Sequence, residues 1–198
     1  MTAPVKRIVF LTGSSKRYKS TSESMADYLI EKLTPQEIEC VKYKCREVVE
    51  DARELEALAD SIRESKVVVL IAPLYVDSLP YPVTRLLEQL TDHHRTDLEG
   101  KKLTCIIHSG YPEPVQRQTC IDICRCFAEK TGMEWLGGIG FGLTSPIDGQ
   151  PLEKLRRMTK WIRASLDEVA NSLKSGTPVT ERAEKLSHKK FPPLPVSL

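Results

Sequence analysis

Features that would assign a protein to a membrane, a secretory route or nucleic acid are missing from this sequence. No apolar run approaches the roughly 20 residues that cross a bilayer. Residues 1–7 lead into the first apolar run without the hydrophobic region of a signal peptide. The net charge of +2 is small and the basic residues are dispersed, which argues against nucleic-acid binding. We therefore expect a cytoplasmic protein with no membrane span and no nucleic-acid partner.

Paired cysteine motifs are missing as well. Of the six cysteines, the most closely spaced are Cys120, Cys124 and Cys126, and no two form a C-x-x-C pair. Zinc and iron–sulfur sites usually have tighter, paired spacings, so we expect no metal site. Cys120 and Cys124 lie four residues apart in a helical pattern, which favours packing in the core. In a cytoplasmic protein we expect all six to stay reduced.

Short apolar runs alternate with amphipathic segments along most of the chain. The run at 67–72 is the most apolar and lacks alternation, which is typical of a central parallel strand covered on both faces. Apolar patterning predicts five strands, at residues 6–12, 37–43, 67–72, 103–108 and 135–142. Helical spacing predicts five helices, at residues 22–33, 51–62, 83–90, 114–131 and 151–174. This alternation predicts a doubly wound α/β fold with a five-stranded parallel sheet.

The length of 198 residues suits one domain with a substantial core. We assign residues 1–176 to that domain and residues 177–198 to a proline-containing C-terminal tail. The apolar group at 191–196 contains three prolines, so it cannot form a helix. A disordered tail and an arm that lies on another surface both remain open for this segment.

A loop rich in hydroxyls and cations, residues 13–22, separates the first expected strand from the first helix. A helix N-terminus offers free N–H groups and the positive end of the helix dipole, and Ser and Thr add neutral donors. Such an arrangement binds phosphate. The same residues also suit a polar turn with a good N-cap. The loop alone is compatible with both interpretations.

Nucleoside triphosphates are disfavoured by the spacing in this loop. Residues 13–20 resemble a P-loop, but Tyr18 replaces the second glycine that lets the backbone curl around phosphates. The third strand ends in Ala72 and Pro73, where a nucleotidase usually has a Mg²⁺-binding Asp. The glycine pattern at 138–142 lies on the last strand, so we interpret it as close packing rather than as a dinucleotide motif.

Two further loops are expected at the same edge of the sheet, because ligands bind at the carboxyl ends of parallel strands. Residues 73–82 form a proline-stiffened loop in which Tyr75 offers a ring face and the backbone offers N–H groups. For Tyr81 we favour partial burial as a loop anchor. Ser109 and Gly110 allow the backbone to approach a ring from the other side. In the strand order 2-1-3-4-5 the three loops adjoin, and together they suit flavin mononucleotide (FMN) held without Mg²⁺.

These loops resemble those of the flavodoxin-like NAD(P)H-dependent FMN reductase and quinone reductase family. Residues 13–17 and 20–26 are similar to the family's Gly-Ser-x-Arg and Ser-x-Ser/Thr-x-x-Leu-Ala patterns, and residues 72–75 look like its Pro-x-Tyr loop. The resemblance covers about residues 6–175 and implies a flavodoxin-like three-layer sandwich of strand order 2-1-3-4-5. It implies contacts to the FMN phosphate from Ser14, Lys16 or Arg17, Ser20, Thr21 and Ser22. It implies contacts to the ring from Pro73, Leu74, Tyr75, Val76, Ser109 and Gly110.

The resemblance implies an oxidoreductase that passes a hydride from NAD(P)H through FMN to a small acceptor, such as a quinone or free flavin. The flavin carries the chemistry, so no catalytic side chain is required, and we assign His93, His94 and His108 to surface or strand-end positions. A homodimer or homotetramer is also implied. Two alternatives remain open. One is an electron-transfer carrier of the flavodoxin type, which is typically strongly acidic, unlike this chain. The other is a flavin-free interaction protein.

Overall fold

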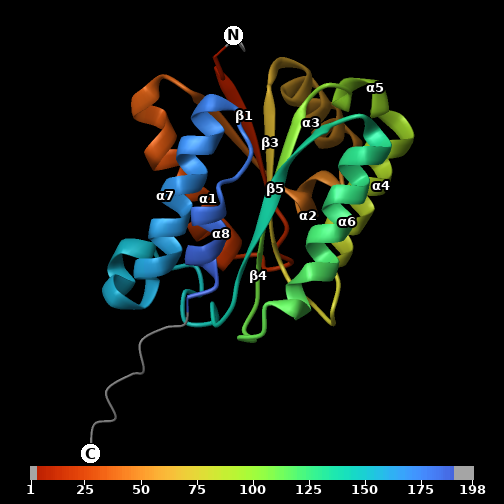
Figure 1. Cartoon of the computed structure of the whole chain (residues 1–198). Helices are drawn as coiled ribbons and strands as arrows, with labels where there is room; N and C mark the ends of the chain where they lie inside the picture. Colours follow the sequence, from red (N-terminus) through yellow and green to blue (C-terminus); the bar gives the residue numbers. More distant parts are fainter. Residues whose placement is uncertain (1–3, 190–198) are drawn as a thin grey trace, which may run out of the picture.

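The computed structural model describes residues 4–189, which form three layers around a central sheet (Figure 1). The sheet is entirely parallel, with strand order β2-β1-β3-β4-β5. Its strands are β1 Arg7–Thr12, β2 Glu39–Lys44, β3 Val67–Pro73, β4 Lys102–His108 and β5 Glu134–Phe141. The longer helices are α1 Thr21–Leu33, α3 Ala52–Glu64, α4 Tyr81–His93, α6 Val115–Thr131 and α7 Lys160–Ser175. The predicted α/β sandwich and its strand order are confirmed.

Short helical segments complete the described chain. They are η1 Thr34–Gln36, α2 Cys45–Val48, α5 Arg95–Leu98, η2 Leu152–Thr159 and α8 Glu181–Ser187. No helix within residues 4–189 is both long and apolar enough to cross a bilayer.

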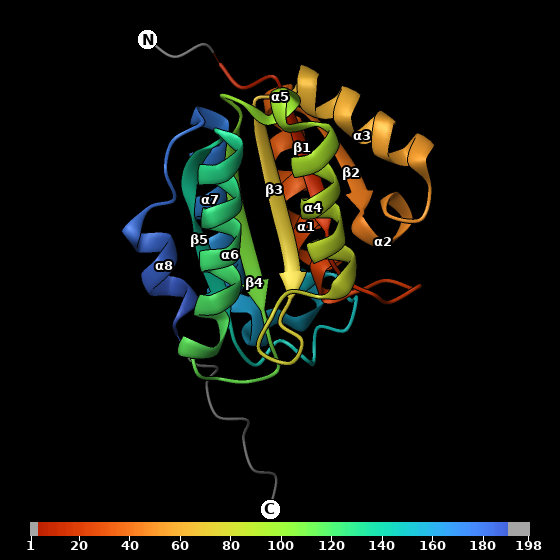
Figure 2. The same cartoon turned by 90° about the vertical axis from the view of Figure 1, so that its right-hand side faces the viewer.

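Both faces of the sheet are covered by helices. Helices α1 and α7 cover one face, and α3, α4 and α6 cover the other (Figures 1 and 2). All seven residues of β3 are buried, and they alternate between the two sides. Val68 and Leu70 pack in the core beneath α3, α4 and α6, whereas Val69 and Ile71 pack in the core beneath α1 and α7. Two apolar cores therefore stabilise the sheet. The loops at the strand ends are where binding residues are expected, because loops on a rigid scaffold usually provide them.

The predicted helix over residues 151–174 is wrong in its first third. Leu152–Thr159 form the 3₁₀ segment η2, in which Arg156 has φ 41° and ψ −107°, and α7 begins only at Lys160. Leu152 is buried, and its carbonyl accepts a hydrogen bond from the Thr159 hydroxyl at 2.5 Å. This bond from a side chain competes with the helical backbone ladder, so apolar spacing alone extends the helix too far.

Residues 177–189 lie against the sheet and α7. Val179 N donates to Leu136 O of β5 at 2.7 Å. Helix α8 is capped by Thr180, and Ser165 of α7 donates through its hydroxyl to Ala183 O at 2.6 Å. Helix α8 is too short to show a sustained apolar period, which is why it does not emerge from the sequence. The apolar group at 191–196 lies outside the described residues.

Candidate functional site

A cavity of about 210 Å³ lies at the carboxyl ends of β1, β3, β4 and β5, where parallel sheets bind ligands. This edge of the sheet is the lower one in Figure 2. The lining residues are Ser14, Lys16, Ser20, Thr21, Pro73, Leu74, Tyr75, His108, Ser109, Gly110, Thr144, Ser145 and Asp148. The three loops singled out in the sequence therefore meet around one cavity, and the loop after β5 joins them.

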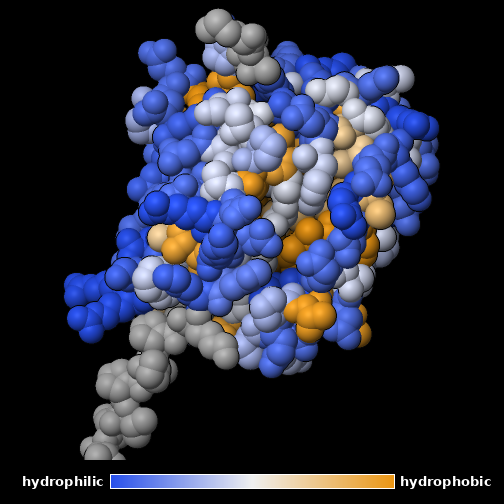
Figure 3. Space-filling view, in the orientation of Figure 1, coloured by the Kyte–Doolittle hydropathy of each residue, from blue (hydrophilic) through white to orange (hydrophobic). Residues whose placement is uncertain are grey.

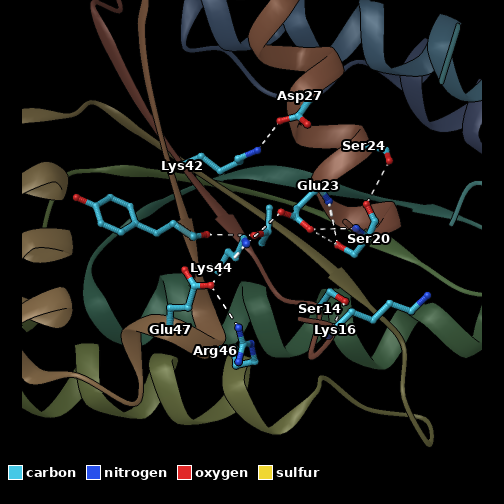
Figure 4. A network of polar contacts seen from close by, with 12 residues as sticks. Ser14, Lys16, Ser20, Glu23, Ser24, Asp27, Lys42, Lys44, Arg46 and Glu47 are labelled. Carbon is cyan, nitrogen blue, oxygen red and sulfur yellow. Dashed lines mark hydrogen bonds and ion pairs between the residues drawn. The ribbon is translucent and has the colours of Figure 1, made fainter. Parts of the chain in front are cut away.

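The loop after β1 is anchored by the start of α1 (Figure 4). Ser20 is the N-cap, because its hydroxyl accepts a hydrogen bond from Glu23 N at 3.3 Å, while the Glu23 carboxylate accepts one from Ser20 N at 3.0 Å. This reciprocal pair is a capping box. Thr21 also lines the cavity, and its hydroxyl has no hydrogen-bond partner among residues 4–189. Thr21 thus presents a free hydroxyl at the helix N-terminus.

Lys16 and Asp148 join the loops after β1 and β5. Lys16 Nζ lies 2.5 Å from Asp148 Oδ1, and the hydrogen bond to this carboxylate raises the pKa of Lys16. The same loops touch at Gly149, which has φ 79°, and a Cβ there would lie 2.5 Å from Lys19 O. Only glycine suits that position. An anion that binds Lys16 must compete with Asp148 for its charge.

His108, the last residue of β4, connects three parts of the site. Its Nε2 lies 2.8 Å from Ser22 Oγ, and its Nδ1 lies 3.4 Å from Thr144 Oγ1. Its carbonyl accepts a hydrogen bond from Leu74 N at 2.8 Å. Burial, together with the charge of Lys16, lowers the pKa of His108 from 6.5 to about 3. The imidazole is therefore neutral at physiological pH and holds these loops without adding charge.

The loop after β3 carries a tight turn at residues 75–78. Tyr75 N donates to Ser78 O at 2.9 Å, and Ser78 N donates to Tyr75 O at 3.1 Å. Val76 has φ 47° and Asp77 has φ 59°, which is the pattern of a type I′ turn. A β-branched residue is strained in this conformation, so the turn is held by its neighbours rather than by Val76. Tyr75 is 43% exposed at the edge of the cavity.

The loop after β4 lies close to the loop after β5. Ser109 N donates to Phe141 O at 2.9 Å, and the Ser109 hydroxyl donates to Tyr111 O at 3.0 Å. A Cβ on Gly110 would lie 2.7 Å from Ser145 Oγ, so glycine permits this approach. The N–H groups of Gly110 and Tyr111 have no acceptor within residues 4–189. This loop therefore keeps two backbone donors free.

Nine of the twelve residues predicted to contact FMN line the cavity. Of the other three, Ser22 is buried with its hydroxyl on His108, Arg17 is exposed outside the lining, and Val76 is 98% exposed in the turn. The contact of each predicted residue with FMN stays a prediction. The lining residues that the sequence did not indicate are His108, Thr144, Ser145 and Asp148. A signal for Ser145 and Asp148 exists, because a Ser-Pro-x-Asp-Gly turn follows the last strand at this same edge.

The site offers hydrogen-bond donors, one lysine and an aromatic ring. Within residues 4–189 no group of three or more His, Cys, Asp or Glu side chains is placed to hold a metal ion. The six cysteines are free thiols. Burial raises the pKa of Cys45 and of Cys120 to about 12, which keeps both in the unreactive protonated form.

Comparisons with known proteins bear on the fold. No protein-family profile and no curated protein sequence matches the chain. Among solved structures, an NADH:FMN oxidoreductase in its apo form is 14% identical with a TM-score of 0.66, over 93% of this chain and 97% of that one. A WrbA-like flavodoxin from Agrobacterium tumefaciens is 14% identical with a TM-score of 0.58, over 85% of this chain and 99% of that one. An NADPH-quinone reductase from P. pentosaceus is 15% identical with a TM-score of 0.56, over 86% of this chain and 98% of that one.

At such identities a structural likeness establishes the fold and leaves the activity open. The strand order and these structures agree with the resemblance seen in the loops of the sequence. The chain therefore has the flavodoxin-like fold, which it shares with solved FMN oxidoreductases and quinone reductases.

Proposed function

We propose that this protein is an FMN-binding oxidoreductase that transfers a hydride from NAD(P)H through the flavin to a small acceptor, such as a quinone or free flavin. The observation that supports the proposal most is the meeting of two different loops around one cavity. The free hydroxyl of Thr21 stands at a helix N-terminus, which suits a phosphate. Tyr75 stands on the turn after β3, which suits a flat ring.

The cavity offers donors that suit FMN, and its volume would enclose only part of the cofactor. Donors without partners include the Thr21 hydroxyl and the Gly110 N–H group of the lining and the N–H group of the adjacent Tyr111, and Lys16 adds a cation. The enclosed volume of about 210 Å³ is below the roughly 300–1,000 Å³ of clefts that enclose a drug-sized ligand. Part of the cofactor would therefore lie outside the cavity, against its rim.

Aromatic and apolar side chains are exposed on the loops around that rim. Within residues 4–189, all the exposed large hydrophobic side chains lie on loops or helix starts at this edge of the sheet, namely Tyr18, Tyr75, Val76, Tyr81, Tyr111 and Val115. The expected partial burial of Tyr81 is therefore wrong, because this residue is 73% exposed at the start of α4. In Figure 3 the lower edge of the molecule, toward which the strands run in Figure 1, is largely hydrophilic and carries small apolar patches. Such a rim suits a flat ring and a second ring stacked on it, as in a nicotinamide or a quinone.

FMN, when bound, would supply the two-electron chemistry. The chain's own residues would then bind and orient. Thr21 and Lys16 would hold the phosphate, and Lys16 would have to exchange Asp148 for it. Tyr75 would support the ring, and neutral His108 would keep the loops in register without placing a charge beside it. No residue of this chain is assigned a proton transfer.

Flavin titration followed by turnover tests the proposal. We expect saturable quenching of FMN fluorescence on addition of the purified protein, and oxidation of NADH or NADPH by the loaded protein when a quinone is supplied. Protein that binds no flavin would favour an interaction protein, and FMN binding without NAD(P)H oxidation would favour an electron carrier.

Thr21→Val is the sharpest variant for the phosphate position. It removes a hydroxyl that bonds to nothing in residues 4–189, so we expect weaker FMN binding with unchanged stability. Ser15→Ala is the matched control, because Ser15 is exposed on the same loop and does not line the cavity. Ser20→Ala is less clean, since loss of an N-cap costs about 1 kcal/mol of stability. Equal affinity in T21V and S15A would remove Thr21 from the phosphate site.

A further inference from the structure

A buried arginine lies behind the cavity wall formed by Ser109 and Gly110. Arg117, in the first turn of α6, is only 2% exposed. It fits there because Gly140 in β5 and Gly142 just after β5 have no side chains. A Cβ on Gly140 would lie 2.9 Å from Arg117 Nε, and one on Gly142 would lie 3.2 Å from Arg117 Nη1. These two glycines therefore make the space for a guanidinium, which gives the expected close packing of β5 a specific purpose.

The guanidinium supports the loop after β4 from behind. Arg117 Nη1 donates to Ser109 Oγ at 2.9 Å and to Tyr111 O at 3.0 Å. The Ser109 hydroxyl in turn donates to Tyr111 O. Arg117 thus fixes both ends of the segment that contains Gly110, and Ser109 and Gly110 line the cavity. Its charge is therefore hydrogen-bonded directly to a residue of the cavity lining.

This charge has no carboxylate partner. Arg117 forms no ion pair within residues 4–189, and its Nε is buried without an acceptor. Burial lowers the pKa of Arg117, and the charge of Glu113 opposes that shift, but a guanidinium remains protonated in proteins. Arg125 on the same helix differs, because it is exposed and lies 3.0 Å from Asp122. A buried and unpaired cation is expensive, which points to a role beyond packing.

We infer that Arg117 is a positioning residue that makes the Ser109–Gly110 side of the cavity selective for a ring carrying negative charge. The inference rests on the proposed function, and the ligand it concerns is FMN in its electron-rich, reduced state. An unpaired cation and free backbone donors stabilise charge that develops on a ligand, because they are already oriented when it appears. Positive charge close to a flavin ring is also one of the means by which proteins tune its electronics.

Affinities for the two redox states of FMN test this inference. Oxidised FMN is titrated into wild type, Arg117→Gln, Arg117→Lys and Arg125→Gln, and dithionite-reduced FMN is titrated anaerobically into the same four proteins. We expect R117Q to weaken binding of reduced FMN at least about tenfold more than binding of oxidised FMN. The ratio of the affinity for reduced FMN to the affinity for oxidised FMN would then fall about tenfold. A fall of this size lowers the two-electron reduction potential of the bound flavin by about 30 mV. R125Q, which removes an exposed and paired charge from the same helix, should leave the ratio unchanged.

Arg117→Lys keeps the positive charge, on a single ammonium group, so the ratio of its affinities for reduced and oxidised FMN should stay close to that of wild type. This variant keeps the inference testable if R117Q fails to fold. A tenfold change of the ratio in R117K, or equal weakening of both redox states in R117Q, would show a purely structural arginine and overturn the inference. Absence of FMN binding by wild type would instead overturn the proposed function itself, and this assignment with it.

Discussion

Acidification below pH 6.5 should destabilise this protein through His108, because its buried imidazole resists taking up a proton in the folded state. The pKa of His108 is lowered from 6.5 to about 3 by burial and by the charge of Lys16. Above pH 6.5 the histidine is neutral in the folded and the unfolded chain, so it does not affect the pH dependence of stability. Below pH 6.5 the unfolded chain binds a proton that the folded chain refuses, and stability falls with pH until about pH 3.

The size of this effect follows from the shift. Each pH unit between the two pKa values costs about 1.4 kcal/mol of unfolding free energy. Between pH 7 and pH 5 the loss is about 2 kcal/mol, once the gradual titration near pH 6.5 is included. This value depends little on the pKa of the folded state, because pH 5 lies well above it. A loss of this size is a large part of the 5–15 kcal/mol by which domains are usually stable.

Urea unfolding of wild type and His108→Gln at pH 7, 6 and 5 measures the effect. Gln cannot titrate, so the free energy of unfolding of H108Q should fall by about 2 kcal/mol less than that of wild type over this range. A uniform loss of stability in H108Q does not matter, because only the pH dependence is compared. The other titratable groups are the same in both proteins, so their effects cancel in the comparison. His93→Gln is the control, since His93 is exposed at the end of α4.

Identical pH dependence in wild type and H108Q would refute the reasoning. It would mean that His108 takes up its proton in the folded state, and hence that water or a carboxylate reaches the ring. The hydrogen bonds to Ser22 and Thr144 would then not be the lasting partners of the imidazole.

Further substitutions test other parts of the site. Asp148→Asn frees Lys16 from its ion pair. FMN titration at low salt should therefore show an affinity raised by about three- to tenfold. Weaker binding would mean that Asp148 positions the lysine. Val76→Asn relieves a β-branched residue at φ 47°, and urea unfolding should show a gain of about 1 kcal/mol; no gain would argue against the positive φ. Gly140→Ala places a Cβ 2.9 Å from Arg117 Nε. Urea unfolding of this variant should show a loss of about 1–3 kcal/mol of stability, and FMN titration should show weaker binding. Unchanged stability and FMN affinity in G140A would show that the guanidinium of Arg117 can move to accommodate the added methyl group.

The sheet and the first loop could be read from the sequence because their signals are local. β3 is a continuous apolar run, and seven buried residues in a row confirm its central place. The hydroxyl-rich loop indicated a good N-cap, and Ser20 fills that position, where it forms a capping box with Glu23. Parallel strands bring their carboxyl ends to one edge, so the convergence of the loops after β1, β3 and β4 followed from strand order alone.

Arg117 and His108 were beyond the reach of such signals. An arginine in the first turn of a helix with polar neighbours has the pattern of a solvent-facing residue, and its burial depends on glycines of a strand that comes later in the chain. A histidine at a strand end gives no sign of whether its ring faces water. In both cases the environment of the polar group is made by distant segments, which periodicity within one element does not describe.

The way α1 begins has a consequence for how the protein would acquire a cofactor. Ser20 and Glu23 satisfy one another from within the chain, and Lys44 Nζ lies 3.5 Å from the Glu23 carboxylate. The loop that would receive a phosphate therefore needs none in order to take its shape. In the proposed oxidoreductase this loop would already have its shape before FMN arrives. Binding of the phosphate would then not have to order this part of the chain, which lowers the entropic cost of taking up the cofactor.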